Sequence, residues 1–457
     1  MGTFYHGDCL FVLKHDIQPN SVDLIYLDPP FFTGKIQKGE WRPAAMEVSY
    51  EDSKKFWAEK ADVMREKAPE WLRHIALKQP DFASYLYYMI ERLRACHHVL
   101  KPIGSIYLHC DYRASHHLKL VMDEIFGYEH FRNEIIWKRD ASGKGAKTIS
   151  RQWPRIYDSI LFYSKTDNWF FEQQFTGVTP LQIKEYHYEN SDGRKFKRTS
   201  LGDYTEESIK ELESKGLIYV SSSGHKYKKY YLDEAKVTID SIWADIYGFG
   251  VITSSKERTG YPTQKPEALL ERIIKASSKE GDTVLDPFCG CGTTVIVASK
   301  LNRQWVGIDI DTAPRDKGEL PKAFQVIQNR SHSLFEQAKY VTRDLSEIKE
   351  MDGNAFEAWV NEFYKATKPR PDKGVDGITP NGIPIQAKTY LIKYPVLSEF
   401  VTNAKLHHAL PKPIKEIIAV SQTGFDDGAR KRRFEIEMAD NIKVRLETPE
   451  NMLELND

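Results

Sequence analysis

The chain is poor in cysteine, in net charge and in long apolar runs. Five cysteines among 457 residues form an odd and sparse set, which argues against a disulfide framework and indicates a reducing compartment. No apolar run is long enough to cross a bilayer, and the opening residues lack a charged-then-apolar signal. We therefore expect an intracellular protein that does not insert into a membrane.

The charges balance, because Lys+Arg and Asp+Glu both number 65. A nucleic-acid partner must then be held by local basic patches, since the net charge gives no attraction. The sequence also lacks internal repeats and low-complexity tracts. At 41% hydrophobic residues, the chain can bury cores for two or three domains.

A segment near the start combines an apolar strand with an acid, two prolines and an aromatic ring. The strand is followed by Asp28-Pro29-Pro30-Phe31. Asp28 and the carbonyl of Pro29 can each accept one hydrogen of an exocyclic base amine, and Phe31 offers a flat face to a planar base. The prolines hold both acceptors stiff. Asp-Pro-Pro can also simply end a strand, so the segment needs support from elsewhere in the chain.

A second segment has the composition of a loop that binds a nucleotide-like ligand. A strand ending at Asp286 runs into a turn that contains Gly290 and Gly292, and a helical pattern follows. The glycines let the backbone approach a ligand closely, and the helix presents unpaired N–H groups. A further strand ends at Asp309, where an acid can bind the two hydroxyls of a ribose.

Together these segments resemble the amino-group DNA methyltransferases that use S-adenosylmethionine, in the beta-class order that places the catalytic motif before the cofactor loop. The resemblance covers roughly the first three quarters of the chain, with a gap between about 140 and 255. It implies a Rossmann-like α/β sheet, double-stranded DNA as partner, base flipping and a cytoplasmic restriction-modification or related system of prokaryotic or phage type. Three further motifs carry it: Gly7-Asp8-Cys9-Leu10, Gly104-Ser105-Ile106-Tyr107-Leu108-His109-Cys110-Asp111 and Tyr261-Pro262-Thr263-Gln264-Lys265-Pro266.

The resemblance also implies roles for single residues. The catalytic turn would be Asp28, Pro29, Pro30 and Phe31. The cofactor would contact Asp286, Phe288, Gly290 and Gly292 through its methionine part, Asp309 through its ribose, Asp8 near its adenine and Lys265 near its carboxylate. For Asp8, a helix cap before Leu10 is the alternative. Cytosine-N4 enzymes usually carry Ser in place of the first acid, so Asp28 favours adenine N6, with cytosine N4 as the alternative.

Cysteine and histidine residues form two groups that invite comparison with zinc sites. Cys289 and Cys291 have no second thiolate pair nearby in the sequence, and the cluster from Cys96 to His117 lacks zinc-finger spacing. We therefore expect no metal in the methyltransferase part.

The pattern of elements predicts four blocks. Residues 1–140 and 256–335 alternate strands with helices and predict two parts of one doubly wound sheet, the catalytic and the cofactor-binding part. Residues 141–255 contain basic stretches interleaved with aromatics, at 195–198 and 225–231. Such stretches suit phosphate contact and base stacking, so we expect an inserted target-recognition domain; a solvated surface hairpin is the alternative.

The fourth block, residues 350–457, predicts a smaller α/β domain. A predicted hairpin carries Asp376 on one strand, with Gln386 and Lys388 on one face of the next. This arrangement resembles the Mrr-like branch of restriction-endonuclease folds. It implies that Asp376 and Gln386 bind Mg²⁺, that Lys388 orients the attacking water and that Glu357 adds a carboxylate. A degenerate fold kept for DNA binding or subunit contact is the alternative, which leaves a homodimer open.

Three functions follow from these blocks. The first is a site-specific DNA adenine-N6 methyltransferase whose tail is accessory. The second is a bifunctional polypeptide that both methylates and cleaves DNA. The third is a non-catalytic DNA-binding protein, against which the intact Asp28 and glycine loop speak.

Overall fold

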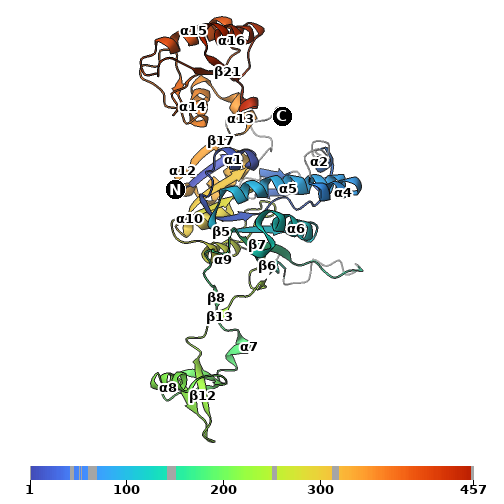
Figure 1. Cartoon of the computed structure of the whole chain (residues 1–457). Coiled ribbons are helices and arrows are strands. Elements are labelled where there is room, and N and C mark those ends of the chain that lie inside the picture. The colour runs from blue at the N-terminus through green and yellow to red at the C-terminus, as the bar shows by residue number, and fades with distance from the viewer. Residues whose placement is uncertain are drawn as a thin grey trace.

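The computed structural model describes residues 2–35, 37–41, 46–50, 52, 54–59, 69–140, 151–249, 255–310 and 319–453. Figure 1 shows a central sheet covered by helices, a small lobe around β12 at one end and an α/β unit around β21 at the other. Among the described residues, no helix combines the length and apolarity that crossing a membrane requires.

The central sheet has nine strands in the order β14-β6-β7-β5-β2-β15-β16-β1-β17. All neighbours run parallel except β7, which is antiparallel to both β5 and β6. The strands are β1 Gly2–His6, β2 Val22–Leu27, β5 Leu100–Cys110, β6 Phe131–Trp137, β7 Asp158–Ser164, β14 Ile242–Trp243, β15 Thr283–Asp286, β16 Gln304–Asp309 and β17 Lys339–Thr342.

The register of β2 and β15 brings the two sequence motifs together. Leu24 pairs with Val284 and Ile25 with Leu285, so the strand that precedes Asp28 lies beside the strand that leads into the glycine turn. Asp23 strengthens this contact, because its carboxylate accepts the backbone N–H of Thr283 at 2.9 Å. The prediction that one sheet joins the two distant blocks is confirmed.

Helices cover both faces of the sheet, and strand β2 contributes to both cores. Ile25 and Leu27 face one buried cluster while Leu24 and Tyr26 face the other, as the two-residue period of a strand requires. The first face carries α1 Cys9–His15, α2 Lys54–Glu59, α4 Glu70–Lys78, α5 Pro80–Val99 and α6 Ser115–Phe126. The second carries α9 Glu267–Ser277, α10 Thr293–Lys300, α11 Lys322–Arg330 and α12 His332–Gln337.

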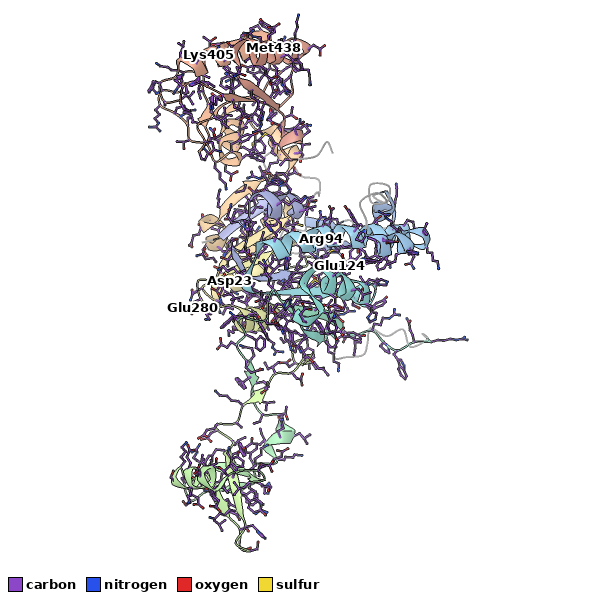
Figure 2. The ribbon with its side chains drawn as sticks, viewed as in Figure 1. Asp23, Arg94, Glu124, Glu280, Lys405 and Met438 are labelled. Carbon is purple, nitrogen blue, oxygen red and sulfur yellow. The ribbon has the colours of Figure 1, made fainter. Side chains whose placement is uncertain are left out.

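Neighbouring helices on the first face are also joined at the surface. Arg94 of α5 and Glu124 of α6 form an ion pair of 3.3 Å, and Figure 2 shows the two side chains next to each other. Two short elements complete this part of the chain: η2 Tyr128–His130, and the antiparallel pair β3 Gln37–Trp41 and β4 Met46–Tyr50.

The block predicted as an insertion is divided between the sheet and the small lobe. Strands β7 and β14 lie inside residues 141–255 and yet belong to the nine-stranded sheet. The lobe itself is connected to the central part by a two-stranded segment, which we call the neck (Figure 1). The neck is β8 Phe175–Thr176 with β13 Val237–Thr238, and the lobe comprises α7 Pro180–Ile183, β9 Tyr188–Glu189, β10 Lys195–Ser200, α8 Glu206–Ser214, β11 Ile218–Val220 and β12 Lys226–Tyr231.

The C-terminal unit is built on a four-stranded sheet in the order β18-β19-β20-β21. The first pair is antiparallel, as the predicted hairpin requires, and the other neighbours are parallel. The central sheet also extends to β17, past residue 335. The elements are α13 Leu345–Glu350, α14 Gly353–Phe363, β18 Gly377–Ile378, β19 Pro384–Lys388, α15 Tyr394–Leu406, β20 Glu416–Ser421, α16 Asp427–Asp440, β21 Lys443–Glu447 and α17 Pro449–Met452.

The C-terminal unit packs against the central sheet through apolar and charged contacts. Phe11 of α1 belongs to the same buried cluster as Trp359 of α14 and Ile385 of β19. Arg343, which follows β17, forms ion pairs with Asp16 at 2.6 Å and with Glu362 at 2.8 Å.

Candidate functional site

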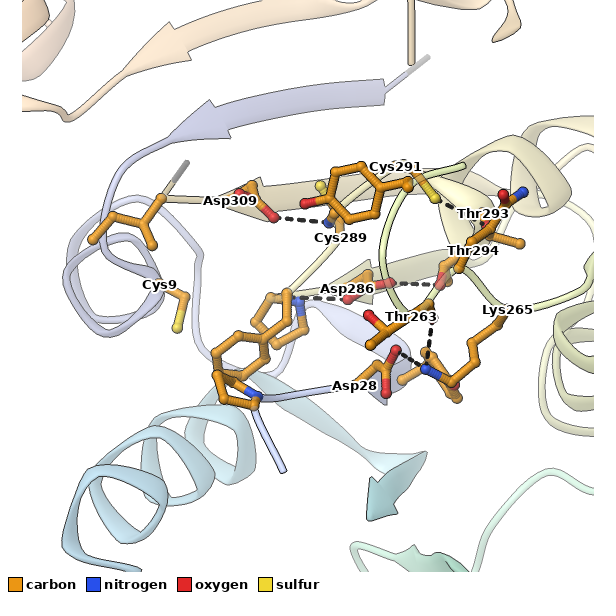
Figure 3. A pocket seen from close by; sticks show the side chains of 18 of the residues that line it. Cys9, Asp28, Thr263, Lys265, Asp286, Cys289, Cys291, Thr293, Thr294 and Asp309 are labelled. Atoms are coloured by element: carbon orange, nitrogen blue, oxygen red, sulfur yellow. Dashed lines mark hydrogen bonds and ion pairs between the residues drawn. The ribbon is translucent and has the colours of Figure 1, made fainter. Parts of the chain in front are cut away.

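A cavity of about 280 Å³ lies at the carboxyl ends of β2, β15 and β16. Open α/β sheets bind their ligands at this edge. Figure 3 shows Asp28, Asp286 and Asp309 around it. The predicted residues that line the cavity are Asp8, Asp28, Pro30, Lys265, Asp286, Phe288, Gly290 and Asp309. Pro29, Phe31 and Gly292 lie outside this lining.

Asp28 is held by a lysine from a distant segment. Lys265 forms an ion pair with Asp28 Oδ2 and donates a second hydrogen bond to the carbonyl of Thr263 at 2.9 Å (Figure 3). The lysine is 7% exposed, so its charge is desolvated and the pairing fixes both side chains. Lys265, which the sequence places near the cofactor, therefore also contacts the acid expected to hold the target base.

The two phenylalanines after the prolines point in different directions. Phe32 adopts a left-handed backbone with φ of 53°, and its ring packs against Phe82 and Tyr85 at centroid distances of 5.1 and 5.7 Å. The ring of Phe31 lies 5.4 Å from that of His109 and 5.4 Å from Lys265 Nζ. The strained turn thus packs the partly buried Phe32 against the core and leaves Phe31 beside Lys265 and His109.

Beneath the turn lies a buried polar network that the sequence did not predict. His109, at the end of β5, is fully buried, and its Nδ1 lies 2.8 Å from the hydroxyl of Tyr26. Its Nε2 lies 3.4 Å from Asp158 Oδ2, and its Nδ1 lies 4.0 Å from Asp28 Oδ1. His109 occurs in the His-Cys-Asp motif, but Asp158 comes from β7, whose position beside β5 no sequence pattern indicates.

Two further acids of the cavity, Asp286 and Asp309, form hydrogen bonds that hold the glycine turn. Asp286 accepts hydrogen bonds from the backbone N–H of Phe288 at 3.0 Å and from the hydroxyl of Thr294. Asp309 Oδ2 accepts the N–H of Gly290 at 2.8 Å. Both glycines have positive φ, and a Cβ on Gly292 would meet Ile327 at 2.7 Å, so the turn needs glycine there.

Burial changes the protonation of Asp286. Its side chain is buried and accepts hydrogen bonds from neutral donors, so the loss of hydration raises the pKa of this carboxyl to about 7. Its neighbours Asp28 and Asp309 act in the same direction. Asp286 is therefore suited to a structural role, in which it holds the glycine turn through its hydrogen bonds with Phe288 and Thr294.

Asp8 takes the position that the alternative prediction gave it, and also lines the cavity. Its side chain caps α1 by accepting the N–H of Leu10 at 2.7 Å. Both its oxygens accept hydrogen bonds from Arg92, at 2.7 and 2.6 Å. The cap fixes the carboxylate at the rim of the cavity.

The cysteines of the glycine turn lie in an apolar setting. Cys289 and Cys291 are buried, and burial raises the pKa of both thiols. In the part of the chain that the structure describes, no group of three or more His, Cys, Asp or Glu side chains is placed to hold a metal ion.

The structure brings Asp376 and Lys388 together and places Gln386 on the same strand as Lys388. Asp376 Oδ2 accepts the N–H of Ala387 at 2.8 Å and lies 3.4 Å from Lys388 Nζ. Gln386 is 5% exposed, and its Oε1 is buried without a hydrogen-bond partner among the described residues. Glu357 forms an ion pair with Lys368 at 2.6 Å.

Burial also affects the acid of this group. It raises the pKa of Asp376, while the N–H of Ala387 and the charge of Lys388 oppose the shift. The charge of Glu357 adds to the increase, so it acts on Asp376.

Comparison with known proteins identifies the family. The DNA methylase family, N6_N4_Mtase, matches residues 22–314, which include Asp28, the glycine turn and Asp309. The chain belongs to this family.

Two individual relatives share less than 30% sequence identity with the chain. The chain is 29% identical over 322 residues to the type II methyltransferase M.EcaI of Enterobacter cloacae; the match spans 64% of this chain and 63% of that enzyme. It is 28% identical over 312 residues to the DNA adenine methyltransferase YhdJ of Escherichia coli, spanning 68% and 79%. Among solved structures, the Thermus thermophilus DNA modification methylase TTHA0409 complexed with S-adenosyl-L-methionine matches with a TM-score of 0.40 and 16% identity, over 75% of this chain and 98% of that one.

Proposed function

We propose that the protein is a site-specific DNA methyltransferase that transfers a methyl group from S-adenosylmethionine to adenine N6 as part of a restriction-modification or related system. The observation that carries this proposal is the placement of Asp28 and the glycine turn at one edge of the sheet, around one cavity. Family membership supports it, and two relatives bear the names of methyltransferases.

The catalytic turn would act by drawing the target amine toward tetrahedral geometry. The amine lone pair of adenine is delocalised into the ring, so two acceptors must hold its hydrogens before it can attack. Lys265 fixes Asp28 Oδ2, while Oδ1 lies beyond hydrogen-bond distance of His109 and can accept one hydrogen. The carbonyl of Pro29 would accept the other, and Phe31 would stack on the flipped base.

The cavity suits S-adenosylmethionine, which supplies an electrophilic methyl group on a sulfonium when bound. Asp309 would bind ribose hydroxyls, and the glycine turn allows close approach of the methionine part. Asp8 at the rim would lie near the adenine and Lys265 near the carboxylate. Asp28 then offers a negative charge close to the sulfonium as well as an acceptor for the amine.

Label transfer tests this function. The protein is incubated with double-stranded DNA and methyl-labelled S-adenosylmethionine, and the digested DNA is separated into nucleosides. We expect label in N6-methyladenine, and Asp28→Ala should reduce transfer by about 100-fold or more. Label in N4-methylcytosine would correct the base, while no label on any DNA would overturn the proposal. Sequencing the modified bases then gives the recognition site.

The buried oxygen of Gln386 favours a second activity, DNA cleavage by the C-terminal unit. A buried amide oxygen without a partner is costly, and here it is a neighbour in sequence to Lys388 and Ala387, both of which contact Asp376. A carboxylate and an amide oxygen are ligands that Mg²⁺ accepts. Asp376 and Gln386 would hold the ion, with Glu357 close enough to act on Asp376, and Lys388 would orient a water.

Unmethylated DNA that contains the recognition site tests the cleavage proposal. We expect cutting in Mg²⁺ and its loss in Lys388→Ala, with methyl transfer unchanged in the same variant. If the unmodified protein leaves such DNA whole, the C-terminal unit is accessory.

A further inference from the structure

Two loops, one after β5 and one between β6 and β7, bring exposed arginines and aromatic rings to the edge of the sheet that carries Asp28. Strands β5 and β6 run parallel to β2 and end at this edge, while the antiparallel β7 begins there. We call the exposed arginine and aromatic side chains of these loops the arginine–aromatic patch: Tyr112, Arg113, Arg139, Arg151, Trp153, Arg155 and Tyr157.

The order of strands places the patch on a definite side of the site. Strands β15 and β16, which carry the glycine turn and Asp309, lie on one side of β2. Strands β5, β7 and β6 lie on the other side. The loops of the patch therefore lie on the side of Asp28 that faces away from the cofactor half.

Trp153 is the most unusual residue of the patch. It is 92% exposed, although a large indole ring normally gains free energy by burial. Tyr112 and Tyr157 add exposed rings at 37% and 40%. Next to β6 in Figure 1, the chain projects away from the body of the sheet.

The charges of the patch fit a polyanion. Arg155 lies over the ring of Tyr112 at 3.8 Å and donates a hydrogen bond to Gln152 Oε1 at 3.1 Å. Arg113 is paired with Asp111, while no ion pair joins Arg151 or Arg155 to a described acid. Arg139 is bound to Asp158 at 3.1 Å, which links the base of the patch to His109. Guanidinium groups beside stackable rings are the pattern that contacts both phosphates and bases.

We propose that this patch binds the duplex beside the target nucleotide and that Trp153 stacks within the base stack next to the flipped base. The proposal rests on the proposed function, because it requires a base that leaves the duplex. Extruding a base breaks its stacking and pairing, and an inserted side chain offsets part of that cost. The arginines would hold the flanking phosphates.

The test uses full-length protein and a duplex with 2-aminopurine at the methylated position, once sequencing has located that site. Trp153→Ala should raise the KM for DNA by about 10- to 100-fold and reduce the 2-aminopurine fluorescence increase. Trp153→Phe should restore most of both signals. Tyr128→Ala is the matched control, because Tyr128 is 75% exposed but precedes β6 at the opposite edge, and it should change neither.

The outcomes separate the two proposals. Calorimetric binding of S-adenosylmethionine shows that each variant retains its cofactor site. If unmodified protein methylates DNA and Trp153→Ala equals it in KM and fluorescence, the role of Trp153 is overturned while the methyltransferase function stands. If unmodified protein methylates no DNA, both proposals fall.

Discussion

Asp28, Asp286 and Asp309 are three of the four carboxylates that line the cavity, and each has a different set of partners. Asp28 is paired with the cation of Lys265, Asp309 accepts a backbone N–H, and Asp286 accepts a backbone N–H and a hydroxyl in a buried setting. Burial without a cationic partner favours the protonated form of Asp286. Residues of one chemical type therefore differ in role: Asp286 holds the glycine turn, while Asp28 is the proposed acceptor for the substrate amine.

The pKa of Asp286 makes the stability of the fold depend on pH. Between about pH 4 and pH 7 the folded state keeps a proton that the unfolded state has lost, so the free energy of unfolding falls as pH rises. Asp286→Asn keeps an acceptor for Phe288 and does not titrate. From pH 5 to pH 8, we expect unmodified protein to lose about 2 kcal/mol relative to this variant in urea unfolding. Parallel pH profiles would contradict the expectation.

His109 should act as a positioning residue for Asp28 and Phe31. His109→Ala removes a partner of both Tyr26 and Asp158 in a buried setting, which should lower the free energy of unfolding by about 1–3 kcal/mol. Loss of support for the turn should lower kcat by up to about 100-fold, with binding of S-adenosylmethionine retained. Tyr26→Phe removes one hydrogen bond and should have a smaller effect. A His109→Ala enzyme with full kcat would assign the network to folding alone.

At the level of elements, local sequence patterns predicted single strands and turns, but they did not predict which strands pair. The strand β2 follows from its apolar run, and the glycine turn follows from its composition. The antiparallel placement of β7 in the sheet could not be predicted, because strand order depends on contacts between distant segments. For the same reason, the contact between Asp158 and His109 could not be predicted. The acids at the strand ends could be predicted from the sequence, because parallel strands end at one edge of the sheet.

The start of α10 depends on two separate properties of Gly292. Its φ of 74° disfavours any side chain, and a Cβ would also meet Ile327 at 2.7 Å. Gly292→Ala should lower the free energy of unfolding by about 2–3 kcal/mol and weaken cofactor binding. Gly281→Ala is the matched control, because Gly281 has φ of 83° in open space and isolates the backbone cost of about 1 kcal/mol. Equal effects in both variants would rule out the steric contribution.

At the scale of the whole molecule, Arg343 joins the C-terminal unit to the sheet. Its side chain is 1% exposed and binds Asp16 of the central part and Glu362 of α14. Arg343→Ala leaves two carboxylates facing each other in a partly buried place, so we expect a loss of about 3 kcal/mol in urea unfolding and faster proteolysis between β17 and α14. Lys339→Ala removes only an exposed partner of Glu362 and should cost less than about 1 kcal/mol. Similar losses in both variants would contradict a special role for Arg343.

The central sheet can be completed only after the late strands that flank β1 have been synthesised. β1 lies between β16 and β17, where Thr3 pairs with Val306 on one side and Lys339 on the other. β1 therefore leaves the ribosome about 300 residues before these partners, which corresponds to roughly 15–60 s at ordinary rates of translation. During this interval its backbone groups on both sides lack their final partners, so a nascent chain of this protein is a natural client for ribosome-associated chaperones.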